Sequence, residues 1–262
     1  GFDKGPSICW SDHVTDSEIG AWYKFGMTIS EHGSKQNKVI EATQAVQQRL
    51  YHMHQRWQQA ADTYFFPEQF RLNLQSCLMV SRTVTFIMQS NKSSINDFDD
   101  WYQGYIEKWR SDSFMTWARD SRNVIEKQGD LSLYSEVRGK IVASYVGCAF
   151  TGWANSRLFS SNDAIRSSIP KKYLNSHVVQ HGTLIIERRW VANSLPNTEI
   201  LEAMAHVYRE LQEATIDLTQ RAEMPLPRWL RNGLPHAMRA LAMNRAAYVS
   251  LADGSTYGYR LF

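Results

Sequence analysis

The chain has 262 residues, of which 43% are hydrophobic and 12% aromatic, and its 29 Lys and Arg residues exceed its 26 Asp and Glu residues by three. A chain of this length and composition can bury a sizeable core in one large globular domain or two small ones, which excludes a mostly disordered protein. The mild positive excess permits binding to a polyanion but does not require it.

Cysteine usage and hydropathy favour a reducing, cytoplasmic setting. Cys9, Cys77 and Cys148 are odd in number, lie far apart and form no Cys-x-x-Cys pair, so neither a disulfide framework nor a zinc site is expected. The longest nearly apolar run, 141–154, is shorter than the roughly 18 to 20 residues that a spanning helix needs. We therefore expect no transmembrane helix, and no signal-peptide pattern is visible.

Two long helices are predicted in the first part of the chain. From Asn37 to Tyr64, apolar residues recur every three or four positions with polar residues between them, which is typical of an amphipathic helix. Pro67 suits the first turn of a second helix, which is expected to end at the polar run 91–94. These two helices are expected to pack as an antiparallel hairpin.

Two further helices complete a predicted bundle. Asp97 or Asp99 can cap a third helix, because a side-chain carboxylate accepts hydrogen bonds from free first-turn amides. Ser113 can cap a fourth helix, which is expected to end near Gly129, since glycine tolerates the positive φ of a C-terminal cap. Four helices of this kind form a bundle.

The second part of the chain shows a mixed pattern. Alternating runs at 137–146 and 183–191 predict strands, and a strong amphipathic helix is predicted after Pro196. The segment 247–262 predicts a hairpin that turns at Asp253-Gly254. The predicted fold class is therefore α+β and predominantly α, with an antiparallel bundle, a mixed strand and helix region, a long C-terminal helix and a terminal hairpin.

These patterns divide the chain into three predicted parts. They are an N-terminal segment at 1–36, a helical bundle at 37–130 and an α+β region at 131–262. The last region is expected to pack on the bundle, either as a separate domain or as part of the same one.

A short pattern near the end of the fourth helix suggests chemistry. Arg122-Asn123 is followed by Lys127 and then Gly129, which resembles the motif of the HEPN superfamily, whose members are helical bundles and in many cases ribonucleases. The family motif has His where this chain has Lys127. The resemblance covers about 37–130.

The resemblance implies roles for three residues. Arg122 would hold a phosphate through two hydrogen bonds and Asn123 would orient the motif, while the family's His moves a proton during attack by an RNA 2′-hydroxyl. Lys127 has an unperturbed pKa of about 10.4, so it stays cationic and is a poor base unless desolvation lowers that value. A non-catalytic module is therefore favoured over a ribonuclease.

Two more arginines join the candidate nucleic-acid-binding set. Arg71 and Arg82 lie on the second helix and could line the same cleft as Arg122. A structural interpretation competes for each cation: Arg122 stands four residues before Glu126 and can form an intrahelical ion pair, and Lys127 can complement the helix dipole.

A metal site has weaker support. His206 has Glu202 and Glu210 at helical spacing, but a single stripe of this kind is more typical of an ion-pair face than of a metal site. No metal and no cofactor are predicted.

Three functions follow as hypotheses. The first is a non-catalytic HEPN-like module that binds RNA or a protein, in bacterial defence or toxin–antitoxin biology. The alternatives are a divergent, metal-independent ribonuclease that uses Arg122 and Asn123, and an oligomeric scaffold. The expected partners are RNA, a protein or a second copy of the chain, with no membrane. Segments 70–74, 97–102 and 187–191 also resemble an uncharacterised bacterial family, which implies a fold but no activity.

Overall fold

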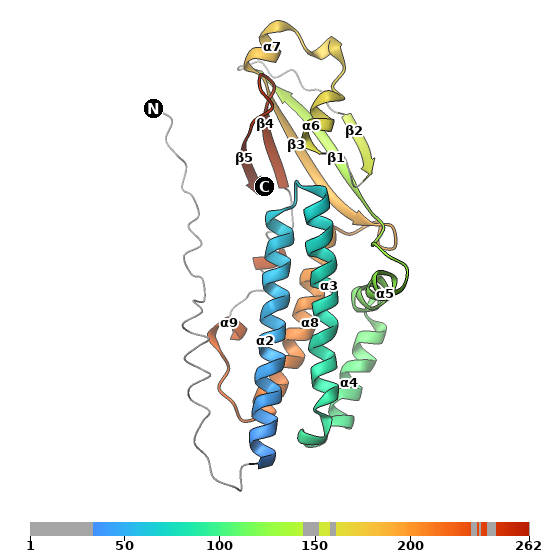
Figure 1. Cartoon of the computed structure of the whole chain (residues 1–262), viewed down its shortest axis with the longest axis vertical. Coiled ribbons are helices and arrows are strands. Elements are labelled where there is room, and N and C mark those ends of the chain that lie inside the picture. Colours follow the sequence, from blue (N-terminus) through green and yellow to red (C-terminus); the bar gives the residue numbers. More distant parts are fainter. Residues whose placement is uncertain are drawn as a thin grey trace.

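The molecule is elongated, with helices packed along most of its length and an antiparallel sheet at one end (Figure 1). The computed structural model describes residues 34–143, 152–157, 161–231, 235, 237–239 and 245–261. Helices predominate in these ranges, and the predicted α+β class is confirmed. Cys9 and Cys148 lie outside these ranges, as does the predicted segment 1–36 apart from its last three residues.

Two long antiparallel helices form the centre of the bundle. They are α2 (Ser34–Asp62) and α3 (Pro67–Ser90), as the periodicity predicts, and Pro67 occupies the first turn of α3. Their facing sides are apolar, and Leu50, Trp57 and Phe70 are almost completely buried between them and their neighbours. The hairpin therefore supplies a large part of the core.

Two shorter helices pack beside this hairpin. They are α4 (Phe98–Ser111) and α5 (Ser113–Lys127). The predicted caps differ from the observed ones. Asp97 precedes α4 with φ 51° and makes no side-chain cap, whereas Asp112, rather than Ser113, caps α5 by accepting from the backbone N–H groups of Phe114 and Met115 at 2.9 Å each. Gly129 follows α5 with φ 117°, as expected of a C-terminal cap.

A helix from the second part of the chain completes the bundle. This helix, α8 (Ile200–Arg221), packs against α2, α3 and α5. Trp57 Nε1 donates to the carbonyl of Leu201 at 2.9 Å, and Gln47 Nε2 donates to Thr219 Oγ1 at 2.9 Å. The bundle thus contains helices from both sides of residue 131, and the predicted division there stays a prediction.

The sheet has five antiparallel strands in the order β2-β1-β3-β4-β5. Their bounds are Leu133–Val142 (β1), Gly152–Arg157 (β2), Thr183–Ala192 (β3), Arg245–Ser250 (β4) and Thr256–Leu261 (β5). β3 coincides with the second predicted run, whereas β1 starts four residues before the first run and overlaps it at 137–142. Residues 144–146 of the first run fall outside the described ranges. β4 and β5 form the predicted terminal hairpin, with Gly254 at φ 78° in its turn.

Short helices connect the longer elements. They are η2 (Lys92–Ser94), α6 (Asn162–Ser167), η3 (Lys171–Tyr173), α7 (Ser176–His181) and α9 (Arg228–Arg231). Among the helices within the described ranges, none has the length and hydropathy to cross a membrane.

A buried junction joins the sheet to the bundle. The Trp190 ring of β3 stacks on Phe70 with 4.9 Å between centroids, and its Nε1 donates to the carbonyl of Tyr64 at 2.8 Å. The Tyr64 hydroxyl lies 2.9 Å from the carbonyl of Arg188 and 3.1 Å from Glu199 Oε1. Because Glu199 is the N-cap of α8, this polar contact fixes the start of that helix against the sheet.

Candidate functional site

A pocket of about 310 Å³ opens between α3, α4, α5 and α8. Its wall combines arginine side chains with apolar ones, and among its described lining residues none is acidic. The arginines are Arg82, Arg110, Arg119 and Arg122, and the larger apolar residues are Ile106, Trp109, Met115, Val207 and Leu211. A mostly apolar wall with a few polar groups is typical of small-molecule sites.

Helical periodicity explains why α5 supplies two of these arginines. Met115, Ala118, Arg119 and Arg122 are separated by three or four residues or adjoin one another, so they share one face of the helix. That face turns toward the pocket. Trp117 and Ser121 are buried on the adjoining face, so core packing fixes the rotation of α5 and thereby the direction of its arginines.

Arg122 is the least exposed of the three ion-paired arginines that line the pocket. Its side chain is only 17% exposed, and Nη2 donates to Asn123 Oδ1 at 2.5 Å. Burial lowers the pKa of Arg122, and the positive charges of Arg82 and Arg119 lower it further, while Glu126 acts in the opposite direction. The cation is therefore held in surroundings that already contain an excess of like charge.

Two carboxylates partly compensate the four guanidinium groups. Glu126 accepts from Arg82 Nη1 at 2.8 and 3.1 Å and lies 3.8 Å from Arg122 Nε, so one carboxylate serves two arginines. Asp120 pairs with Arg119 at 2.9 Å. No ion pair involves Arg110 within the described part of the chain. Four cations against two anions leave an excess of two positive charges.

Trp109 supplies an unused donor in the same wall. The residue is 9% exposed, and its Nε1–H has no hydrogen-bond partner among the described residues. Arg122 Nε also makes no hydrogen bond there. Leaving a buried donor unpaired costs about 1–3 kcal/mol. Because neighbouring atoms cover both donors, an acceptor in the pocket would recover part of this energy only after the covering side chains moved aside.

The structure brings together only some of the predicted site residues. Arg82 and Arg122 line one pocket and both pair with Glu126. The pair between Arg122 and Glu126 is the intrahelical ion pair that the structural interpretation predicted. Arg71 instead pairs with Glu68 at 2.7 Å and with Asp130. Asn123 and Lys127 do not line the pocket, and Lys127 is exposed at the end of α5. Of the predicted trio, Arg122 alone lines this pocket, and the roles predicted for the three residues stay predictions.

Three lining residues escaped the sequence interpretation. Arg110, Arg119 and Trp109 belong to the pocket, but none of the sequence patterns described above assigned a site role to them. The signal for Arg119 was present, because it lies three residues before Arg122 on the same helical face. Arg110 gives no comparable signal, since its position depends on the angle between α4 and α5.

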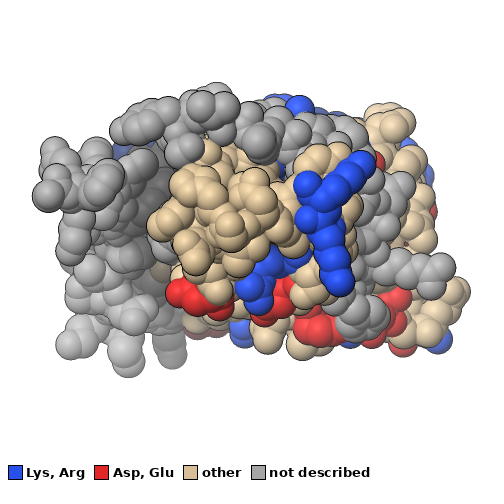
Figure 2. All heavy atoms as spheres, turned by 90° about the horizontal axis from the view of Figure 1, so that it is seen from above, with Lys and Arg blue, Asp and Glu red and all other residues tan. Residues whose placement is uncertain are grey.

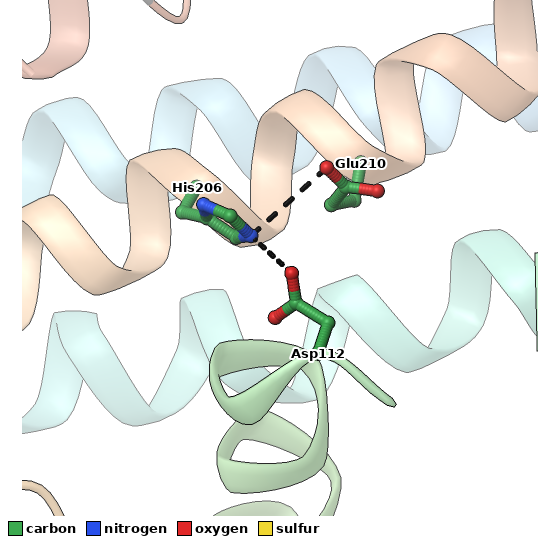
Figure 3. A group of neighbouring side chains, drawn as sticks. All are labelled: Asp112, His206 and Glu210. Carbon is green, nitrogen blue, oxygen red and sulfur yellow. Dashed lines mark hydrogen bonds and ion pairs between the residues drawn. The ribbon is translucent and has the colours of Figure 1, made fainter. Parts of the chain in front are cut away.

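A second polar cluster lies where α4 and α5 meet α8. Figure 3 shows Asp112, His206 and Glu210, with His206 Nε2 2.6 Å from Asp112 Oδ2 and 4.0 Å from Glu210 Oε1. Burial acts to raise the pKa of Asp112, but hydrogen bonds from the Met115 N–H and from His206 outweigh it and lower the pKa. Glu202, the other expected neighbour of His206, pairs with Arg239 at 3.0 Å instead.

Histidine and carboxylate side chains can bind a divalent cation, but the hydrogen bonds of His206 oppose metal binding here. His206 Nδ1 lies 3.2 Å from Arg209 Nη2, a group that can only donate. Nδ1 must then be the acceptor, and Nε2 carries the proton toward Asp112. A metal at Nε2 would have to displace that proton.

The charges around Glu210 also oppose metal binding at this cluster. Its side chain is only 3% exposed, and its two oxygens lie 2.7 Å from Lys108 Nζ and 3.1 Å from Arg209 Nη2. Its charge is therefore already compensated. We interpret the cluster as a network that fixes the corner between α4 and α5 to α8, next to the pocket wall.

Comparison with known proteins identifies the family. The model of the family described as "Bacteriophage lambda protein ea47" matches residues 36–253. The chain belongs to this family. Protein ea47 of Escherichia phage lambda is 40% identical over 173 residues, which are 63% of this chain and 41% of that protein. The chain thus spans less than half the length of this relative. No solved structure matches.

The family assignment corrects the HEPN interpretation, which is wrong. The ea47 family model covers all of 37–130, the segment that carried the HEPN resemblance. The ea47 family also replaces the uncharacterised bacterial family as the family of this chain. Without the HEPN interpretation, the functions predicted from it lose their support. They are the RNA-binding or protein-interaction module, the ribonuclease, the scaffold and the role in defence. In physical terms, the side chains of Arg122 and Asn123 bond to each other, and a three-residue pattern occurs readily by chance.

The surface at the sheet end shows no continuous basic face in its described part. Seen from that end, Lys and Arg side chains lie close to Asp and Glu side chains, beside a broad area of neutral residues (Figure 2). The predicted partners, which are RNA, a protein or a second copy, remain predictions, because the structure holds a single chain.

Proposed function

We propose that the pocket between α3, α4, α5 and α8 binds a small organic anion. The observation that carries this proposal is the excess of two positive charges in a wall that is otherwise largely apolar. Guanidinium groups present paired N–H donors that match the oxygens of a carboxylate or phosphate. The apolar residues offer a surface for the rest of the molecule.

The size of the pocket supports a small ligand. Its volume of about 310 Å³ lies at the lower end of the range of about 300–1,000 Å³ for small-molecule sites. Partial burial also favours binding, because a charge-assisted hydrogen bond is stronger when water is partly excluded. Arg122, which is the least exposed of the ion-paired arginines in the pocket wall, is expected to contribute most.

The test is calorimetric titration with a panel of carboxylates and phosphate esters that carry aromatic or aliphatic groups, with benzyl alcohol as a neutral control. We expect at least one anion to bind and the alcohol not to bind. Arg122→Gln should weaken binding by about tenfold or more, because it removes a charge-assisted contact.

Arg71→Gln is the matched control, since Arg71 is an ion-paired arginine on α3 outside the pocket. It should leave the affinity unchanged. Circular dichroism would establish that both variants fold. The proposal is rejected if no anion binds, or if the two variants lose affinity equally.

We also place the chain in the cytoplasm. This proposal is supported by Cys77, which is buried as a free thiol whose pKa is raised by burial. A protected thiol of this kind suits a reducing compartment. Localisation by fractionation of the host cell would test it.

A further inference from the structure

We infer that the ligand of the arginine-lined pocket is a small phosphate monoester with an aromatic body, held in part by the indole N–H of Trp109. This inference rests on the proposed function and narrows its ligand class. Three features of the pocket carry it: the size of its charge excess, the donors left free in its wall and the shape of its apolar part.

The charge excess favours a doubly charged group. Glu126 and Asp120 compensate two of the four arginines, so two positive charges are left. A phosphate monoester carries about −1.5 to −2 charges at pH 7, whereas a carboxylate carries one. The mutual repulsion of Arg82, Arg119 and Arg122 would be relieved more fully by the doubly charged group.

Three of the four hydroxyl groups of the described wall already donate to backbone carbonyls, which leaves the Tyr102 hydroxyl and N–H groups as donors. Ser81 Oγ donates to the carbonyl of Leu78 at 2.7 Å, and Thr85 Oγ1 donates to the carbonyl of Arg82 at 2.9 Å. The indole N–H of Trp109 and Nε of Arg122 have no hydrogen-bond partner among the described residues, but neighbouring atoms cover both, so a ligand reaches them only after a local side-chain movement. A phosphoryl group has three strong acceptor oxygens, so it can accept from several of these donors at once.

The apolar part of the pocket suits a single ring. Trp109, Met115 and Leu211 line it, and aromatic rings pack favourably against tryptophan and against methionine sulfur. A cavity of about 150 Å³ is enough to hold benzene. The volume of about 310 Å³ therefore accommodates a ring together with its phosphate.

The ligand class is tested by titrating the protein with phenyl phosphate, benzoate, inorganic phosphate and phenol. Phenyl phosphate should bind at least about tenfold more tightly than each of the others, because each lacks either the second charge or the ring. If benzoate binds as tightly as phenyl phosphate, the phosphate inference fails while the proposed organic-anion function stands. If none of the probes and no member of the wider anion panel binds, both fail.

A pH titration separates the charge from the ring. Between pH 7.5 and 5 a phosphate monoester gains a proton with a pKa of about 6, whereas benzoate keeps its charge. The described lining residues contain no His, Asp or Glu; the nearest titratable groups are Glu126 and Asp120, which pair with lining arginines, and His206, which adjoins Val207 on α8, and all three are present with both ligands. Phenyl phosphate should therefore lose affinity over this range, and an affinity that stays constant would contradict a doubly charged ligand.

The role of Trp109 has its own readout. Its indole N–H resonance, assigned by its absence in Trp109→Phe, should move downfield when phenyl phosphate binds, and the variant should bind several-fold more weakly. Trp117 is the matched control on α5, because its Nε1 already donates to Ser194 Oγ at 3.1 Å. If phenyl phosphate binds while the Trp109 resonance stays in place, Trp109 is not a ligand contact.

Discussion

At the scale of single residues, the hydrogen bonds around Glu199 indicate that its carboxyl is protonated in the folded chain. Two acceptors face the single hydroxyl hydrogen of Tyr64, namely the carbonyl of Arg188 and Oε1 of Glu199. Both contacts are satisfied if Glu199 is itself protonated and donates to Tyr64. Burial independently raises the pKa of Glu199 to about 8, although Arg245 and several hydrogen bonds act against this shift.

This proton makes stability depend on pH. Between the ordinary pKa of 4.5 and the folded value of about 8, the folded chain binds a proton that the unfolded chain lacks. The free energy of unfolding should then fall as pH rises through this window and level off above it. Glu199→Gln, which keeps a neutral side chain at the same place, should remove this component.

Urea unfolding of both proteins at pH 5.5 and pH 8.5 measures the effect. The parent should lose more stability between the two pH values than Glu199→Gln does, since other titrating groups are common to both. Equal losses would mean that Glu199 is ionised in the folded chain. Asp62, Arg188 and Arg245 are the other charged groups near this site, and they remain in the variant.

A second prediction at this scale concerns Tyr64. Tyr64→Phe removes the hydroxyl that contacts both Arg188 and Glu199 and leaves a buried carboxyl with one partner fewer. We expect a loss of about 1–3 kcal/mol in the free energy of unfolding. Urea denaturation at pH 6 measures it. The control is Tyr51→Phe, because Tyr51 is only half-buried; a similar loss in both would refute a special role for the junction.

At the scale of elements, the Asp112 side chain both caps α5 and contacts α8. Its Oδ1 caps α5, and its Oδ2 accepts from His206 of α8. Asp112→Ala removes both contacts and should cost about 1–3 kcal/mol of stability. Asp112→Asn can still cap the helix and should cost less, because asparagine is among the best N-cap residues.

Chemical denaturation of the two variants distinguishes the tasks. A double-mutant cycle with His206→Gln isolates the contact between the helices. If His206→Gln costs the same in the parent and in Asp112→Ala, the Asp112–His206 contact contributes no coupling, and only the cap matters.

Elements with strong periodicity could be predicted from the sequence, whereas those that depend on distant partners could not. The regular apolar spacing in 37–64 indicates α2 correctly, and Pro67 marks the start of α3. β2 carries the sequence Gly-Trp-Ala-Asn-Ser-Arg, which lacks regular alternation, so its strand form depends on pairing with β1. The pocket shows the same limit, because its wall joins residues of α3, α4, α5 and α8 that no local pattern links. Beside it, Asp112 and His206 are 94 residues apart.

At the scale of the whole molecule, the sheet and the bundle share one buried junction. Trp190 of β3 stacks on Phe70 of α3 and bonds to the carbonyl of Tyr64. Trp190→Leu should therefore destabilise both parts, by about 3–5 kcal/mol if the cavity does not collapse. Far-UV circular dichroism, which follows the helices, and hydrogen exchange of β3 amides should show the same shift. Unfolding of the sheet alone would indicate two independent units.

The position of α8 in the chain has a consequence for synthesis. Trp57 on α2 finds its acceptor in Leu201, 144 residues later. At about 5–20 residues per second, the α2–α3 hairpin would wait roughly 7 to 30 s for this helix to leave the ribosome. Over that time its apolar face stays open to other molecules in the cell, so chaperone binding to the nascent chain should end only when α8 has emerged.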